Sequence, residues 1–185
     1  MDMRLNKMTL FCLTALLAIA LGLPAAGHAQ TKNISFGTGA MSGTYYPLGV
    51  AIAKVWTNAG IGLNVSAEAT GGSVENARHI KNKTMEIGFV ESLVADWAYK
   101  GEEYFKSGPV QNIRGFIALY PNTIQTVVKA NSGIKTYKDL KGKKVACGIQ
   151  GSSSVLNMKI VLESYGVPFS DIKAMVLAGF KSSFL

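Results

Sequence analysis

The chain has 185 residues, of which 48% are hydrophobic and 16% are charged, with a formal net charge of +8. This balance excludes intrinsic disorder, and 20 glycines without a G-X-Y repeat exclude a collagen-like rod. Two cysteines and two histidines are too few for a disulfide scaffold or a four-cysteine zinc site, so no metal or other cofactor is expected.

The first 29 residues have the layout of an export signal. Arg4 and Lys7 precede the apolar run Met8–Leu23, Pro24 ends that run, and small residues follow as far as Ala29. This order of basic, apolar and small-residue regions predicts a cleaved secretory signal peptide and a periplasmic location. An uncleaved membrane anchor is the alternative, but the run is shorter than the ~20 residues that span a bilayer comfortably.

Strand and helix patterns then alternate along the chain. Period-2 and period-3.6 apolar spacing predicts strands at 33–37, 63–69 and 85–89, and helices that begin at 45, 74 and 93 and end near 58–60, 83 and 105. Parallel strands need long crossovers, so this βαβαβα order predicts an α/β domain with a mainly parallel sheet. Two more strands are expected at 114–120 and 123–130.

A second unit is expected from about Asn131. It contains a short helical turn at 135–140, a strand at 144–149, a helix at 155–165 and a strand that starts at 174. Gly166 suits the position just after the helix. Cys147 alternates with Val145 and Ile149, which favours a small core residue over a nucleophile.

Three loops share one design. Thr38–Thr44, Thr70–Ser73 and Gln150–Ser154 each follow a predicted strand, are rich in Gly, Ser and Thr, and open a helix. Helix N-termini offer free N–H groups and a positive dipole end, which suits an anion. One such loop is also what any strand-to-helix turn needs, but three in one chain favour a shared ligand site.

Other chemistries fit the loops poorly. Gly37, Gly39 and Gly43 are spaced one residue too long for a dinucleotide fingerprint, and no Gly-Lys-Ser/Thr sequence is present. Gly151-Ser152-Ser153-Ser154 lacks the closing glycine of a nucleophile elbow, and His79 lies on a polar helix face. The lysines between 135 and 144 form a solvated surface without the interleaved aromatic residues of a nucleic-acid site, so no nucleic acid is expected.

Three stretches carry a family resemblance. GTGAMSGTYYPLG at 37–49, ATGGSVEN at 69–76 and IGFVES at 87–92 together resemble the TAXI family (TRAP-associated extracytoplasmic immunogenic) of solute receptors. These receptors serve tripartite ATP-independent periplasmic transporters. Residues 132–166 are similar to the start of the second lobe in periplasmic binding proteins generally.

The resemblance implies a periplasmic-binding-protein type II-like α/β fold, with a first lobe at 30–130 and an incomplete second lobe at 131–185. It implies a non-enzymatic monomer that binds a small organic anion, of amino acid or dicarboxylate type, and passes it to a TRAP-type membrane permease. An acid at Glu91, where relatives often have an amide, would alter ligand preference or bind an amine. The implied ligand-binding residues are Thr38, Ser42, Thr44, Tyr45, Gly72, Ser73, Glu91, Ser152, Ser153 and Ser154.

The chain's ending departs from the family pattern. Relatives are considerably longer, and residues 179–185 do not resemble their continuation, so a C-terminal truncation is expected. A chain that ends there would lack part of one cleft wall, and low stability and weak binding are expected. The alternatives are a ligand-sensing module for a membrane signalling partner, a non-functional truncated receptor, and an exported enzyme of the same fold.

Overall fold

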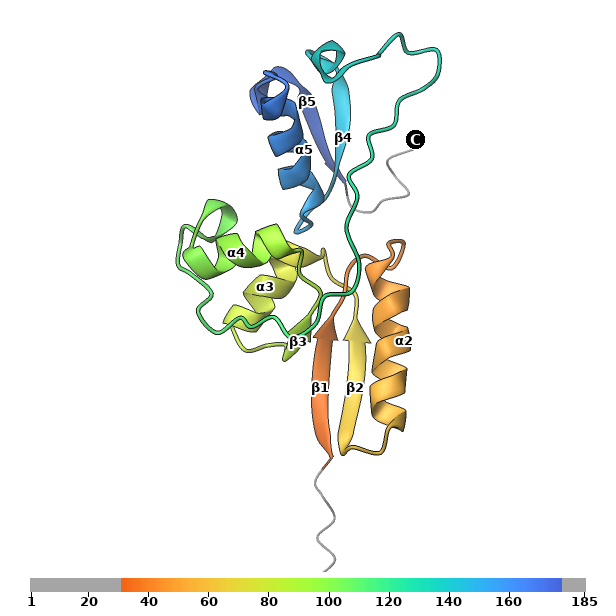
Figure 1. Ribbon diagram of the computed structural model, residues 1–185, viewed down its shortest axis with the longest axis vertical. Helices are drawn as coiled ribbons and strands as arrows, with labels where there is room; N and C mark the ends of the chain where they lie inside the picture. The colour runs from red at the N-terminus through yellow and green to blue at the C-terminus, as the bar shows by residue number, and fades with distance from the viewer. Residues whose placement is uncertain (1–30, 178–185) are drawn as a thin grey trace, which may run out of the picture. The chain divides into compact units, whose positions relative to one another are not determined.

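The computed structural model describes residues 31–177 (Figure 1). The predicted signal segment and the divergent ending at 179–185 lie outside the described residues. Among residues 31–177, no helix is long and apolar enough to span a bilayer. Two parallel sheets are present, and both alternate with helices as the apolar spacing predicts.

The first sheet has the strand order β2-β1-β3, and all its pairings are parallel. Its strands are β1 (Lys32–Gly37), β2 (Leu63–Glu68) and β3 (Ile87–Gly88). The helices that connect or follow them are α2 (Tyr45–Asn58), α3 (Ser73–Lys81) and α4 (Ser92–Lys100). The predicted order of elements is therefore confirmed, and the third strand is shorter than predicted.

Aromatic packing holds α2 against this sheet. Phe36 is only 2% exposed and stacks on Trp56 with the ring centroids 5.8 Å apart. The ring centroid of Phe89 lies 4.7 Å from that of Phe36. Ile34 and Val65 face each other across β1 and β2 in the same cluster. Burying these side chains is the main favourable contribution to the stability of this layer.

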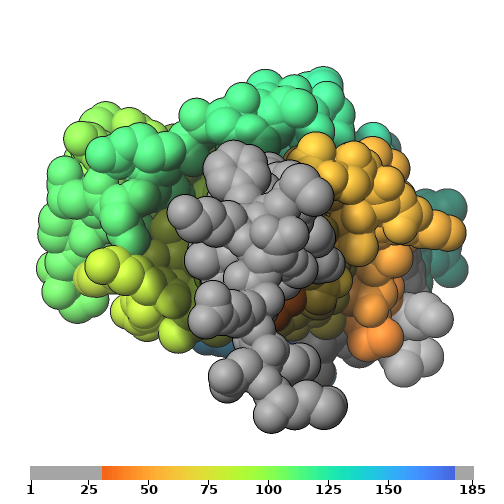
Figure 2. Space-filling view, turned by 90° about the horizontal axis from the view of Figure 1, so that it is seen from below, coloured from red at the N-terminus to blue at the C-terminus, as the bar shows by residue number. Residues whose placement is uncertain are grey.

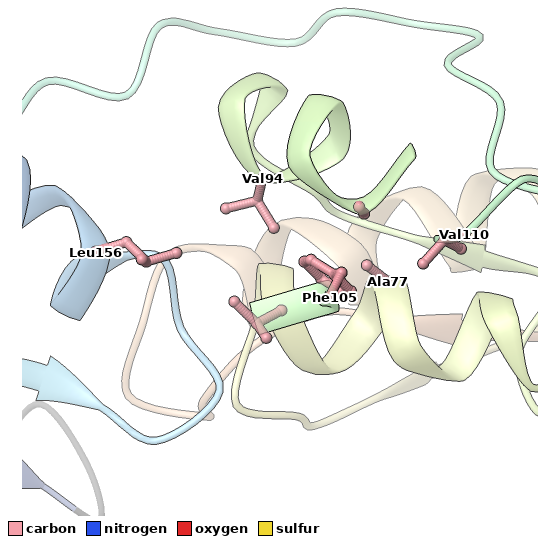
Figure 3. Packing of buried hydrophobic residues seen from close by; sticks show 7 residues of the cluster. Ala77, Val94, Phe105, Val110 and Leu156 are labelled. Carbon is pink, nitrogen blue, oxygen red and sulfur yellow. The ribbon is translucent and has the colours of Figure 1, made fainter. Parts of the chain in front are cut away.

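A second cluster lies between α3 and α4 (Figure 3). Ala77 and Val94 come from the two helices, and Phe105 and Val110 come from the segment after them. Leu156 of α5 (Ser154–Ser164) completes the cluster. Helix α5 therefore contributes a side chain to the core that α3 and α4 form beside the first sheet.

The second sheet pairs β4 (Lys144–Ile149) with β5 (Lys173–Leu177) in parallel. Three single 3-10 turns flank the main elements, at η1 (Glu103–Phe105), η2 (Tyr137–Leu140) and η3 (Phe169–Asp171). Cys147 is 3% exposed and packs with Leu162, which confirms it as a core residue. Gly166 adopts φ +73° just after α5, as its predicted position requires.

The two strands predicted at 114–120 and 123–130 are wrong. This segment has no regular secondary structure and pairs with none of the described strands, and many of its apolar side chains are exposed, with Phe116 at 68% and Val127 at 75%. Apolar alternation identifies an extended chain, whereas a strand also needs a neighbour to receive its hydrogen bonds. Figure 2 shows the green part of this segment beside the orange helix α2. The ring centroids of Phe116 and of Trp56 in α2 lie 6.3 Å apart.

The helix predicted from 93 to 105 also ends early. Gly101 takes a left-handed conformation (φ +79°) and closes α4 at Lys100. The remaining residues form the separate turn η1. The apolar spacing in the sequence does not reveal this break, because Phe105 keeps a helical spacing to the core residues before it.

Candidate functional site

One pocket gathers the loops that follow three strands. The loops after β1, β2 and β4 lead directly into α2, α3 and α5 (Figure 1). They surround a cavity of about 640 Å³. Its lining includes eight of the ten predicted site residues: Ser42, Thr44, Tyr45, Gly72, Ser73, Ser152, Ser153 and Ser154.

The serine loop after β4 presents a hydroxyl to this cavity. Ser152 donates its hydroxyl to the Ile149 carbonyl (2.8 Å) and receives the Ser154 N–H (3.3 Å), which fixes the loop. Ser153 is only 7% exposed as a whole residue and lines the cavity, and its side chain makes no hydrogen bond with another described residue. A hydroxyl that lines a cavity and has no partner in the described part of the chain is suited to a ligand.

Tyr45 forms the aromatic side of the cavity. Its ring lies 5.1 Å from Phe89 and 6.5 Å from Tyr120, and Asn122 Nδ2 lies 3.5 Å from its hydroxyl. The pKa of Tyr45 is raised above its ordinary value, mainly by burial and then by the nearby Tyr120 phenol. A hydrogen bond with the Ser73 side chain lowers it by a smaller amount. The phenol is therefore neutral at physiological pH and can donate a hydrogen bond.

The loop after β4 uses donors at the start of α3 for a hydrogen-bonded contact within the protein. The Gly151 carbonyl accepts hydrogen bonds from Val74 N–H (3.0 Å) and Glu75 N–H (3.2 Å) in the first turn of α3. Gly71 allows this contact, because a Cβ at that position would collide with the Gln150 carbonyl oxygen. Two of the N–H groups that α3 would offer to an anion are thus already used, and Gly72 and Ser73 at its start contribute to the lining.

Two predicted site residues do not line the cavity. Thr38 is 0% exposed and donates its hydroxyl to the Glu68 carbonyl (2.6 Å). Glu91 receives the Asn157 side-chain N–H at 3.2 Å on each carboxylate oxygen, and its own N–H donates to Ser73 Oγ (3.0 Å). In this structure Thr38 fixes the end of β1, and Glu91 joins α4 to α5.

The sequence reasoning missed the residue that organises the loops. Asn76 is fully buried, and its side-chain N–H donates to the carbonyls of Gly37 (3.2 Å), Thr38 (2.8 Å) and Phe89 (2.8 Å). Its oxygen accepts the Thr70 hydroxyl at 2.8 Å. A polar residue on the inner face of the Val74, Ala77 and Ile80 stripe was the available signal.

Tyr120 and Asn122 were also missed. Both line the cavity although they come from the segment expected to form strands. Their placement depends on the path of an irregular segment, and no periodic pattern encodes that path.

A second cavity of about 690 Å³ shares Ala40, Ser42 and Gly71 with the first. It is lined by Glu75, whose carboxylate accepts the Gly71 N–H (2.9 Å) and lies 3.5 Å from His79. Among residues 31–177, no group of three His, Cys, Asp or Glu side chains is placed to hold a metal ion.

Parallel strands whose loops open helices around one pocket define an α/β fold of the periplasmic-binding-protein type II-like kind. Residues 36–184 match the NMT1-like family, and the chain belongs to that family. The matched range includes residues 179–184, which were expected to differ from the sequence of the TAXI family at that point.

A solved structure has a similar fold. It is the alkanesulfonate-binding protein SsuA from Xanthomonas axonopodis pv. citri bound to MOPS, with 16% sequence identity and a TM-score of 0.52. The likeness covers 83% of this chain and 50% of that one, so this chain spans about half the length of SsuA.

Proposed function

We propose that the chain is an extracytoplasmic solute receptor of the TAXI type, which binds a small organic anion and delivers it to a TRAP-type membrane permease. The observation that carries this proposal is the convergence of three strand-to-helix loops on one hydroxyl-lined cavity. Family membership and the fold shared with an alkanesulfonate-binding protein support a solute-binding role.

The chain's own residues suggest how the solute is held. The first residues of α2 and α5 line the cavity, so the N–H groups and the positive dipole ends at these helix starts are placed to attract an anion. Ser153 and Tyr45 add hydroxyl donors, and the Tyr45 ring packs on the solute's carbon skeleton. Contacts from both sheets then favour closure around the solute, because binding stabilises the conformation that makes more of them.

The same residues support binding rather than catalysis. The described residues contain one histidine, His79, whose ring nitrogens lie 2.8 Å from Thr84 Oγ1 and 3.5 Å from Glu75. It does not line the cavity, so among the described residues no histidine base stands beside Ser152, Ser153 or Ser154. A serine without a base is a hydrogen-bond donor, not a nucleophile.

The proposal includes the expected organisation of the chain. Residues 1–29 are the signal peptide that takes the receptor to the periplasm, 30–130 form the first lobe, and 131–185 belong to the second. The receptor acts as a monomer. A TRAP permease gene beside its own would support transport, and a sensor kinase gene there would support the signalling alternative.

Calorimetric titration tests the proposal on the chain without its first 29 residues, with amino acids, carboxylates and sulfonates as probes. We expect one or more to bind, and Ser153→Ala or Tyr45→Phe to weaken that binding about 3- to 10-fold, the usual value of one lost hydrogen bond. Ser66→Ala, at an exposed position in β2, is the matched control and leaves affinity unchanged. Failure of every probe to bind at millimolar concentration would reject the receptor function.

A further inference from the structure

We propose that this cavity selects organic anions that carry one negative charge and rejects dianions. The inference rests on the proposed function and narrows its substrate class. It departs from the dicarboxylate expected from the family resemblance.

The first support is the charge of the cavity wall. Among the described residues, its lining contains glycine, alanine, proline, hydroxyl side chains and Asn122, but no lysine, arginine, histidine, aspartate or glutamate. An anion bound there is neutralised only by N–H dipoles and hydroxyl donors. Such groups can stabilise one anionic group at close range, but they offer no full positive charge to a second.

The donors are also gathered in one place. Ser153, 7% exposed as a residue and without a side-chain hydrogen bond to another described residue, lies at the start of α5 and lines the cavity. Ser42 and Thr44 lead into α2 on the same cavity. The first-turn N–H groups of Val74 and Glu75 in α3 are engaged by the Gly151 carbonyl. One anionic group therefore has donors from α2 and α5, whereas two of the first-turn N–H groups of α3 are not available for another.

Two acidic side chains among the described residues lie close to the cavity. Glu75 lines the adjoining cavity, which shares Ser42 and Gly71 with this one. Glu91 bonds to Asn157 and lies close enough to Tyr45 for its charge to act on that phenol. A second negative charge on the solute would be desolvated without a counter-ion in the described lining and would be repelled by these nearby carboxylates, so dianions bind more weakly.

Matched amide and acid pairs test this selection, because an amide replaces a carboxylate with almost no change in shape. Succinamate is compared with succinate, and glutaramate with glutarate, by calorimetric titration of the chain without its first 29 residues. We expect the singly charged member of each pair to bind at least about tenfold more tightly.

A charge added to the wall provides the second arm. Ser42→Lys places a cation at an exposed position on the lining, and we expect it to shift the preference toward succinate and glutarate. Ser66→Lys, on exposed β2 surface, is the matched control for net charge and leaves the preference unchanged.

The outcomes separate the two proposals. Dianions that bind as tightly as their amides, or a Ser42→Lys variant with an unaltered preference, would overturn charge selection and leave the receptor function intact. Binding by none of the four probes, together with none of the amino acids and sulfonates, would overturn both.

Discussion

Asn76 shows how one buried amide can determine the geometry of a binding site. Its side chain bonds to the ends of β1 and β3 and to Thr70 before α3, so three separate loops share one anchor. Gly37 and Gly88 pack directly against it, and a Cβ at Gly37 would approach Asn76 Oδ1 to 2.6 Å. An amide is needed here because a single side chain must both donate and accept.

Replacing this amide should be costly. Asn76→Ala leaves the carbonyls of Gly37, Thr38 and Phe89 buried without their donor, and we expect the free energy of unfolding to fall by about 2–4 kcal/mol. Asn64→Ala removes an exposed amide that bonds only to Asn33 (2.9 Å) and should cost less than about 0.5 kcal/mol. Urea unfolding of both variants measures the difference, and equal losses would show that Asn76 is not the anchor.

At the scale of elements, the sequence predicted regular structure well and irregular structure poorly. The starts of α2, α3 and α5 fall at or within a residue of their predicted positions, because core-facing residues repeat every turn. The segment 114–130 fails because its apolar residues face no partner strand. The family resemblance implied Thr38 and Glu91 as ligand contacts, but it does not specify local hydrogen bonding, and in the structure both side chains bond to protein groups instead of lining the cavity.

The contact between the loops after β2 and β4 depends on a missing side chain. Gly71→Ala would push its Cβ against the Gln150 carbonyl, so we expect the loops to separate and the melting temperature to fall by about 2–8 °C. Amide exchange at Val74 and Glu75 should quicken as they lose the Gly151 carbonyl. Gly115→Ala, where a Cβ meets nothing within 4 Å, is the control. Unchanged exchange at both amides in Gly71→Ala would contradict this role for glycine.

The turn η2 is held by a reciprocal cap whose strength depends on pH. The N–H groups of Lys135 (2.9 Å) and Thr136 (2.8 Å) donate to the Asp139 carboxylate, and these bonds lower its pKa in the folded chain. A carboxyl with a lowered folded pKa stabilises the fold above its unfolded value of about 4, and this contribution is lost as the pH falls through the folded value.

Asp139→Asn should therefore reduce stability at pH 7, and its deficit should shrink as the pH falls below about 4. Thermal unfolding across this range measures the gap between the variant and the parent chain. Asp96→Asn, which removes an exposed ion pair with Lys100 (2.8 Å), serves as the control and should have a small effect. A deficit that stays constant with pH would show that ionised Asp139 is not the source of the stability.

For the molecule as a whole, function depends on loops that are far apart in sequence. Residues near 42, 73, 120 and 153 meet at one cavity because parallel strands end at the same edge of each sheet and the segment 114–130 returns past Tyr45. The sequence predicted the contributions of the strand-to-helix loops from their shared design. It could not predict Tyr120 or Asn122, because their positions are determined by tertiary packing.

The central claim is that a small organic anion binds where these loops meet. Amide chemical-shift mapping during titration with the tightest-binding carboxylate or sulfonate tests it most directly. We expect the largest shifts at Ser42, Thr44, Ser153 and Ser154, with Lys32–Ser35 at the start of β1 unaffected. Saturable shifts confined to residues outside the cavity, with these four amides unmoved, would contradict the account.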